Sequence, residues 1–104
     1  MPPAIDPFKF PESIQEGMRA RLVCTVIQGD PPFLFRWFKD DELIDPPVNS
    51  VITRTDDFSS DLTFNRVSPR HNGNYTCVVS NSYASDSHSA YLNVDGKYLV
   101  NFWN

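Results

Sequence analysis

The stretch Asn72-Gly73-Asn74-Tyr75-Thr76-Cys77 decides the fold class of this 104-residue sequence. From Tyr75 onward, apolar residues alternate with more polar ones, which is typical of a half-buried β-strand. Successive side chains of a strand point to opposite faces, so Tyr75, Cys77 and Val79 are predicted to share the buried face. The sequence thus places a cysteine in the core, two residues after a tyrosine.

Three other residues stand at informative distances from this strand. Cys24 lies on a second alternating stretch, residues 19–27, and Trp37 follows it by 13 positions. Leu62 precedes Cys77 by 15 positions. The two cysteines could be buried thiols or one disulfide. A disulfide over this separation would stabilise the fold by about 4 kcal/mol and would imply an oxidising compartment.

Further strands are predicted at short intervals, which is the pattern of an all-β sandwich. The expected strands are 4–10 (an edge strand broken by prolines), 19–27, 33–39, 43–44, 48–55, 61–67, 75–79 and 87–94. The sequence has no long segment of helical period and no apolar run that could span a membrane. We expect one domain over residues 1–95, followed by a linker or tail over 96–104.

Composition excludes several classes of function. The balance of 9 Lys+Arg against 13 Asp+Glu gives a net charge of −4, which argues against nucleic-acid binding. Neither GxGxxG nor GxxxxGKS occurs, and the histidines His71 and His88 lack zinc spacing and an evident catalytic partner. We therefore expect no enzyme, no cofactor and no small-molecule substrate. A calcium site at Asp56, Asp57 and Asp61 is conceivable, but acids in a turn are more often solvated.

The spacings together resemble the immunoglobulin sandwich, and in particular its I-set subclass. Residues 36–43 are similar to the motif W-[YF]-K-[DN]-G-x-x-L, and residues 72–77 with Asn81 are similar to D-x-G-x-Y-x-C-x-x-x-N. His71 departs from the family, which usually has an aspartate there that pairs with an arginine. The departure leaves the partner of Arg54 open.

This resemblance implies the arrangement of the core. The expected fold is a two-sheet Greek-key sandwich in which a Cys24–Cys77 disulfide joins the sheets. Trp37 would fill the space beside the sulfur atoms, with Leu62 nearby. The hydroxyl of Tyr75 would bond back to the backbone at the corner before its strand.

Two runs resemble the Dscam cell-adhesion family more closely, namely residues 5–11 (I-D-P-F-K-F-P) and 70–77 (R-H-N-G-N-Y-T-C). The most similar counterparts are its variable seventh immunoglobulin domain and the first domain of the shortened Dscam forms, and the resemblance covers residues 3–94. It implies a homophilic adhesion module of an extracellular, plasma-membrane protein. Such a module binds a second copy of itself and meets the membrane only through its parent. A heterophilic receptor domain and an intracellular structural domain of muscle type remain alternatives.

The outward face of residues 19–27 is the predicted surface for self-recognition. Arginines are expected at one end of this sheet, and Asp56, Asp57 and Asp61 at the other. Two antiparallel copies about a two-fold axis would then place basic against acidic twice. The predicted interface residues are Arg19, Arg21, Val23, Thr25, Ile27, Asp61, Thr63 and Asn65.

The opposite sheet is the second candidate surface. Phe38 and Val78 are predicted to point outward there and to form an apolar patch. Asn74-Tyr75-Thr76 is the one N-x-S/T sequon in the sequence, and it predicts glycosylation of Asn74. A glycan at that position would hinder binding to this sheet.

Overall fold

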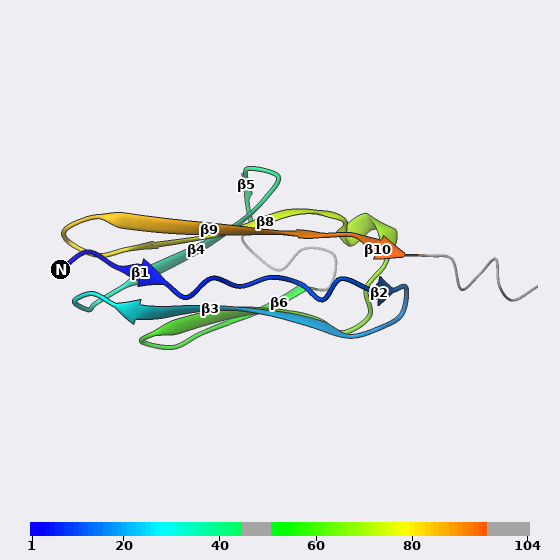
Figure 1. Cartoon of the computed structure of the whole chain (residues 1–104), viewed down its shortest axis with the longest axis horizontal. Helices are drawn as coiled ribbons and strands as arrows, with labels where there is room; N and C mark the ends of the chain where they lie inside the picture. The colour runs from blue at the N-terminus through cyan, green and yellow to red at the C-terminus, as the bar shows by residue number, and fades with distance from the viewer. Residues whose placement is uncertain (45–50, 96–104) are drawn as a thin grey trace, which may run out of the picture.

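The structure, a computed structural model, describes residues 1–44 and 51–95. This part of the chain is an elongated sandwich of two β-sheets, with the N-terminus at one end and β10 at the other (Figure 1). The all-β, two-sheet prediction is confirmed. The expected tail 96–104 and the first part of the expected strand 48–55 lie outside the described residues.

The first sheet has four strands in the order β1-β3-β7-β6, all antiparallel. Their bounds are Ala4–Ile5 for β1, Ala20–Gln28 for β3, Val51–Thr55 for β6 and Ser59–Phe64 for β7. β1 is much shorter than the predicted edge strand 4–10. Prolines at positions 7 and 11 have no N–H to donate, so pairing stops before them.

The second sheet has the order β5-β4-β8-β9, also antiparallel. Its strands are β4 (Leu34–Lys39), β5 (Glu42–Leu43), β8 (Gly73–Ser80) and β9 (Ser85–Leu92). β4 and β5 are joined by a tight turn in which Asp40 and Asp41 have φ values of 50° and 69°. Aspartate tolerates this left-handed region better than most residues, and here Asp41 takes the place of the glycine in the family motif.

The N-terminal segment crosses from one sheet to the other. β1 pairs with β3 of the first sheet, whereas β2 (Ile14–Gln15) pairs in parallel with β10 (Val94–Asp95), the continuation of β9. Between them, Phe10 lies buried and its ring meets those of Phe64 and Tyr75 edge-on. The segment therefore closes one side of the sandwich (Figure 1).

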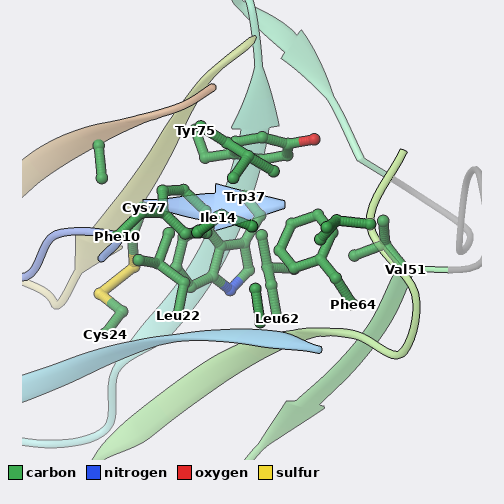
Figure 2. Packing of buried hydrophobic residues seen from close by; sticks show 14 of the residues in the cluster. Phe10, Ile14, Leu22, Cys24, Trp37, Val51, Leu62, Phe64, Tyr75 and Cys77 are labelled. Atoms are coloured by element: carbon green, nitrogen blue, oxygen red, sulfur yellow. A yellow bond between two sulfur atoms is a disulfide. The ribbon is translucent and has the colours of Figure 1, made fainter. Parts of the chain in front are cut away.

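The core lies between the two sheets (Figure 2). Cys24 and Cys77 form the expected inter-sheet disulfide, with their Cα atoms 6.4 Å apart. Trp37 and Leu62 are buried beside it, and the indole Nε1–H of Trp37 donates to the buried hydroxyl of Ser60 at 2.9 Å. This hydrogen bond satisfies the polar atom that burial of an indole would otherwise leave without a partner.

The corner before β8 is held by Tyr75 and His71. The Tyr75 hydroxyl donates to the backbone carbonyl of His71 at 2.6 Å, as expected from the family pattern. His71 belongs to the short 3₁₀ helix η1 (Pro69–His71) and is buried, and its Nδ1 accepts from the backbone N–H of Ser68 at 3.0 Å. Histidine thus caps the corner in place of the usual aspartate. Arg54 lies elsewhere, exposed on the outer face of the first sheet.

Candidate recognition surface

The outer face of the first sheet is built from side chains that the strand register aligns in rows. One row runs Arg21, Thr63, Ile52 across β3, β7 and β6, and the next runs Val23, Asp61, Arg54. These side chains point outward because Leu22, Leu62 and Val51 on the alternate positions point into the core. The register therefore decides which charges of the three strands meet.

The basic end of this face is hollowed. A depression of about 300 Å³ is lined by Arg19, Arg21, Ile52, Arg54, Asp61, Thr63 and Asn65. Thr63 is only 8% exposed although it lies on the outer face, because its neighbours surround it. Three arginines and one aspartate line the depression, which makes it net positive.

Arg21 and Asp61 form an ion pair within this depression. Arg21 Nη2 lies 2.8 Å from Asp61 Oδ2, and the two side chains are 53% and 13% exposed. The other carboxylate oxygen, Oδ1, is buried and accepts no hydrogen bond from any residue that the structure describes. The prediction that Asp61 lies at an acidic end of the sheet is wrong: it pairs with Val23 in the middle of the sheet, beside Arg21.

The acidic end of the face is the turn between β6 and β7, which holds Asp56 and Asp57. Asp56 Oδ1 accepts hydrogen bonds from the backbone N–H of Phe58 and from the hydroxyl and backbone N–H of Ser59. These bonds, that from Phe58 foremost, hold the pKa of Asp56 below its ordinary value of 3.8. The carboxylate therefore stays charged to lower pH than an ordinary aspartate.

The conceivable calcium site is not assembled. Asp61 contacts Arg21, and Asp56 is bonded within its own turn. Among residues 1–44 and 51–95, no group of three potential metal ligands comes together.

The other predicted interface residues are spread along the same face. Val23 and Thr25 are half-buried in the middle of β3, and Ile27 is 63% exposed near its end. Ile52 and Arg54 belong to the face but were not among the predicted residues. Their signal was present, because alternation around the apolar Val51 places both on the opposite, outward side of β6.

The outer face of the second sheet is less continuous. Phe38 and Val78 are only half-buried, and the guanidinium of Arg36 lies over the Phe38 ring at 5.9 Å from its centre. The exposed apolar residues of this sheet are Leu34, Leu43 and Tyr91. Leu43 pairs with Phe38 in the β4–β5 register, whereas Leu34 and Tyr91 lie in widely separated rows. Phe38 and Val78 lie in neighbouring outward rows of the sheet, and the apolar patch on this face stays a prediction.

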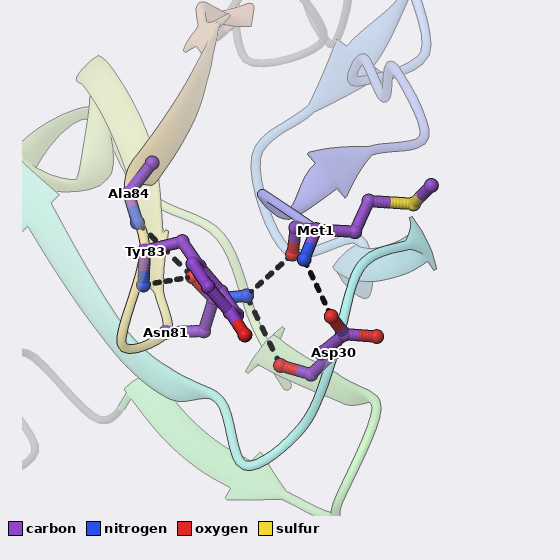
Figure 3. Close-up of polar contacts among 5 residues, drawn as sticks. All are labelled: Met1, Asp30, Asn81, Tyr83 and Ala84. Carbon is purple, nitrogen blue, oxygen red and sulfur yellow. Dashed lines mark hydrogen bonds and ion pairs between the residues drawn. The ribbon is translucent and has the colours of Figure 1, made fainter.

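Asn81 holds together the loops at the N-terminal end of the sandwich (Figure 3). Its side-chain Nδ2 donates to the carbonyls of Met1 and Asp30 at 2.8 and 3.0 Å. Its Oδ1 accepts from the backbone N–H groups of Tyr83 and Ala84 at 2.9 and 3.1 Å. One asparagine of the family motif therefore ties the β8–β9 turn to two segments that are distant in sequence.

The two-layer fold, the disulfide and the tyrosine corner define an immunoglobulin domain. A family model described as "Immunoglobulin domain" matches residues 2–81, and the chain belongs to this family. It is 42% identical over 94 residues to cell adhesion molecule Dscam2 of Drosophila melanogaster, covering 90% of this chain and 4% of that protein. It is 38% identical over 102 residues to cell adhesion molecule DSCAM of Homo sapiens, covering 96% of this chain and 5% of that protein.

The chain is also similar in structure to solved immunoglobulin domains, including one from Dscam1. The Dscam1 Ig7 domain, isoform 5, superposes with a TM-score of 0.86 at 26% identity, covering 90% of this chain and 97% of that one. The titin I-band fragment I67–I69 gives a TM-score of 0.80 at 29% identity, covering 90% of this chain and 32% of that one. The predicted resemblance to Dscam is confirmed, and the chain is an immunoglobulin domain similar to those of the Dscam proteins. No helix long and apolar enough to cross a membrane occurs in the described ranges.

Proposed function

We propose that this domain mediates homophilic cell–cell adhesion by pairing the outer face of its first sheet with the same face of a second copy. The observation that supports this proposal is the charge order of the face. The positive depression around Arg19 and Arg54 lies at one end, and the exposed carboxylates of Asp56 and Asp57 lie at the other.

If two copies pack face to face about a two-fold axis through the middle of the face, the charges of one copy complement those of the other. Two antiparallel copies bring the acidic turn of each over the positive depression of the other, so the same contact forms twice. Val23, Thr25 and Thr63 then lie near the axis, and Ile27 adds exposed apolar area. The Arg21–Asp61 ion pair stays within each copy, so Arg19 and Arg54 provide the positive charge for the partner.

The comparisons support an adhesion role at the cell surface. The relatives are named cell adhesion molecules, and this chain spans about a twentieth of their length. We infer an extracellular location, because the Cys24–Cys77 disulfide is stable in oxidising compartments. The expected partner is a second copy of the domain. A single contact of this size would be weak, and many copies in parallel would supply the strength of adhesion.

A pair of charge reversals tests the interface. Arg19→Glu places an acid opposite Asp57 of the partner, and Asp57→Lys places a base opposite Arg19 of the partner. Each variant alone is expected to lose self-association in sedimentation-equilibrium experiments. Mixed in equal amounts, the two variants are expected to associate with each other, because both contacts of the mixed pair join opposite charges.

The mixing experiment has a matched control on the second sheet. Leu34→Glu changes an exposed residue of the other sheet and is expected to leave self-association unchanged. If Leu34→Glu abolishes association while the reversals at positions 19 and 57 do not, the interface lies on the second sheet. If the unaltered domain stays monomeric at every concentration, the homophilic proposal fails.

A structural immunoglobulin domain is the second candidate, supported by the likeness to titin I67–I69 at 29% identity. Such a role needs no self-association. Cell-aggregation assays separate the candidates: cells that display this domain are expected to cluster with cells that display the same sequence and not with cells that display an unrelated immunoglobulin domain.

A further inference from the structure

The sequon Asn74-Tyr75-Thr76 begins one residue inside β8, on the outer face of the second sheet. Gly73 and Tyr75 are buried, so the Asn74 side chain points away from the core and is exposed. The backbone N–H of Asn74 donates to Asp40 Oδ1 at 2.9 Å. Its side-chain amide makes no hydrogen bond with any residue in the described ranges.

An exposed aromatic ring lies directly beside this asparagine. Asn74 pairs with Tyr91 in the β8–β9 register, and directly opposite residues of antiparallel strands have Cβ atoms about 5 Å apart. Tyr91 is 62% exposed. Its ring makes no aromatic contact with the described part of the chain, so its apolar faces are open to a flat, partly apolar group.

The surface next to Tyr91 leaves room for such a group. The outward residues that precede it on β9, Ser89 and Ser87, are small and exposed. A sugar ring attached at Asn74 can therefore lie over Tyr91 without meeting a bulky neighbour along the strand.

We propose that Asn74 carries an N-linked glycan whose first sugar packs on the ring of Tyr91. The donor would be an oligosaccharide joined to a lipid diphosphate. Asn74 Nδ2 loses a proton and bonds to the anomeric carbon of N-acetylglucosamine, while the bond from that carbon to the diphosphate breaks and the lipid diphosphate leaves with the electron pair. The proposal requires export of the chain, and it does not depend on the self-recognition interface.

The fold places the transfer before the sheet closes. The Thr76 hydroxyl lies 2.6 Å from that of Ser89. Tyr75 and Thr76 are paired on both sides, with β4 and with β9, and Asn74 is paired with β9 and accepts at its backbone carbonyl from the N–H of Asp40. A segment that is already paired in a folded sheet cannot enter an enzyme's acceptor groove, so the glycan is expected to be added to the nascent chain before β8 pairs. Once attached, it covers part of the second sheet and leaves the first sheet open.

Mass measurement tests whether Asn74 is modified. We expect the chain, secreted from a eukaryotic host, to be heavier than its polypeptide mass and to lose the excess on treatment with a glycan-removing amidase. Asn74→Gln and Thr76→Ala are expected to abolish the excess mass. Thr76→Ser, which keeps the sequon and the hydroxyl, is expected to retain it. Secreted chain at the bare polypeptide mass would overturn the proposal.

A double-mutant cycle tests the contact with Tyr91. We expect the glycosylated domain to melt a few degrees above its Asn74→Gln variant, because an ordered sugar on the ring stabilises the folded state. The same increment is expected in the Tyr91→Phe background, which keeps the ring. In the Tyr91→Ala background the increment is expected to vanish. An equal increment in all three backgrounds would show that the sugar does not use the ring and would overturn that part of the proposal.

Discussion

Arg21 and Asp61 are joined across β3 and β7 by an ion pair of 2.8 Å on the face that we propose for self-recognition. The two residues are diagonal neighbours, because the register places Val23 opposite Asp61 and Thr63 opposite Arg21. Asp61 is the more enclosed partner. The pair therefore belongs to the architecture of the face, whereas Arg19 and Arg54 form no ion pair within the described ranges.

The first prediction separates these roles. Arg21→Ala is expected to lower the free energy of unfolding by about 1 kcal/mol, a modest cost because Arg21 itself is half exposed. Arg19→Ala is expected to change stability by less than about 0.5 kcal/mol and yet to weaken self-association. Urea denaturation and sedimentation equilibrium of the same two variants check both parts. A larger stability loss for Arg19→Ala than for Arg21→Ala would contradict this assignment.

The second prediction concerns the loops that Asn81 connects. Asn81→Ala removes all four of its hydrogen bonds, whereas Asn81→Asp keeps the two that Oδ1 accepts from Tyr83 and Ala84. Asn81→Ala is expected to lower stability by about 1–2 kcal/mol and to speed amide exchange at Tyr83 and Ala84. Asn81→Asp is expected to keep these two amides protected while it loses the links to Met1 and Asp30.

The exchange rates of these two amides show which hydrogen bonds of Asn81 hold the β8–β9 turn. If Tyr83 and Ala84 exchange equally fast in both variants, the β8–β9 turn depends on the donated bonds to Met1 and Asp30 and not on the accepted ones.

Alternation in the sequence was sufficient to predict the core. Buried and exposed positions follow a period of two along β3 and β8, so Cys24 and Cys77 could be placed inside from the pattern alone. The family spacings then indicated their pairing and the positions of Trp37 and Tyr75. Alternation is a property of each strand by itself, so these features could be predicted without knowing which strands pair.

Alternation did not predict where along the sheet each outward side chain lies. The predicted strand began at Asp61, which made Asp61 an end residue, whereas β7 begins at Ser59. Because the strand starts two residues earlier than predicted, Asp61 still points outward, but it lies in the middle of the sheet, beside Arg21. Register depends on the partner strand and the turn, so one strand's pattern cannot fix it. The capping role of His71 likewise appears only once the corner is folded.

The third prediction concerns pH and the tyrosine corner. Burial, and to a lesser degree the negative charge of Asp40, raises the pKa of Tyr75 above its ordinary value of 10.0. The unfolded chain ionises this phenol near its ordinary pKa, whereas the folded chain keeps it neutral. Its contribution to stability is therefore complete below about pH 10 and is lost as the pH rises further.

Tyr75→Phe exposes this dependence. At neutral pH the variant is expected to be less stable than the unaltered domain by about 1–2 kcal/mol, since the hydrogen bond to the His71 carbonyl is lost. The difference is expected to shrink as the pH rises above about 10, because only the unaltered domain loses the contribution of the phenol. Urea denaturation over a pH series measures this, and a difference that stays constant with pH would count against it.

The fourth prediction uses two adjacent aspartates that share a backbone conformation but not a role. Asp40 and Asp41 both have positive φ in the β4–β5 turn, where glycine carries no steric penalty. Asp41→Gly is expected to raise the free energy of unfolding by about 0.5 kcal/mol. The relief of backbone strain in the folded turn is larger than this, but the greater freedom of glycine in the unfolded chain offsets part of it. Asp40→Gly gives the same steric relief but removes the acceptor of the Asn74 N–H, so it is expected to lower stability.

Thermal melts of the two variants compare them directly. Equal gains in both would mean that the hydrogen bond from Asn74 to Asp40 contributes nothing to the fold, and the turn would then be limited by backbone strain alone.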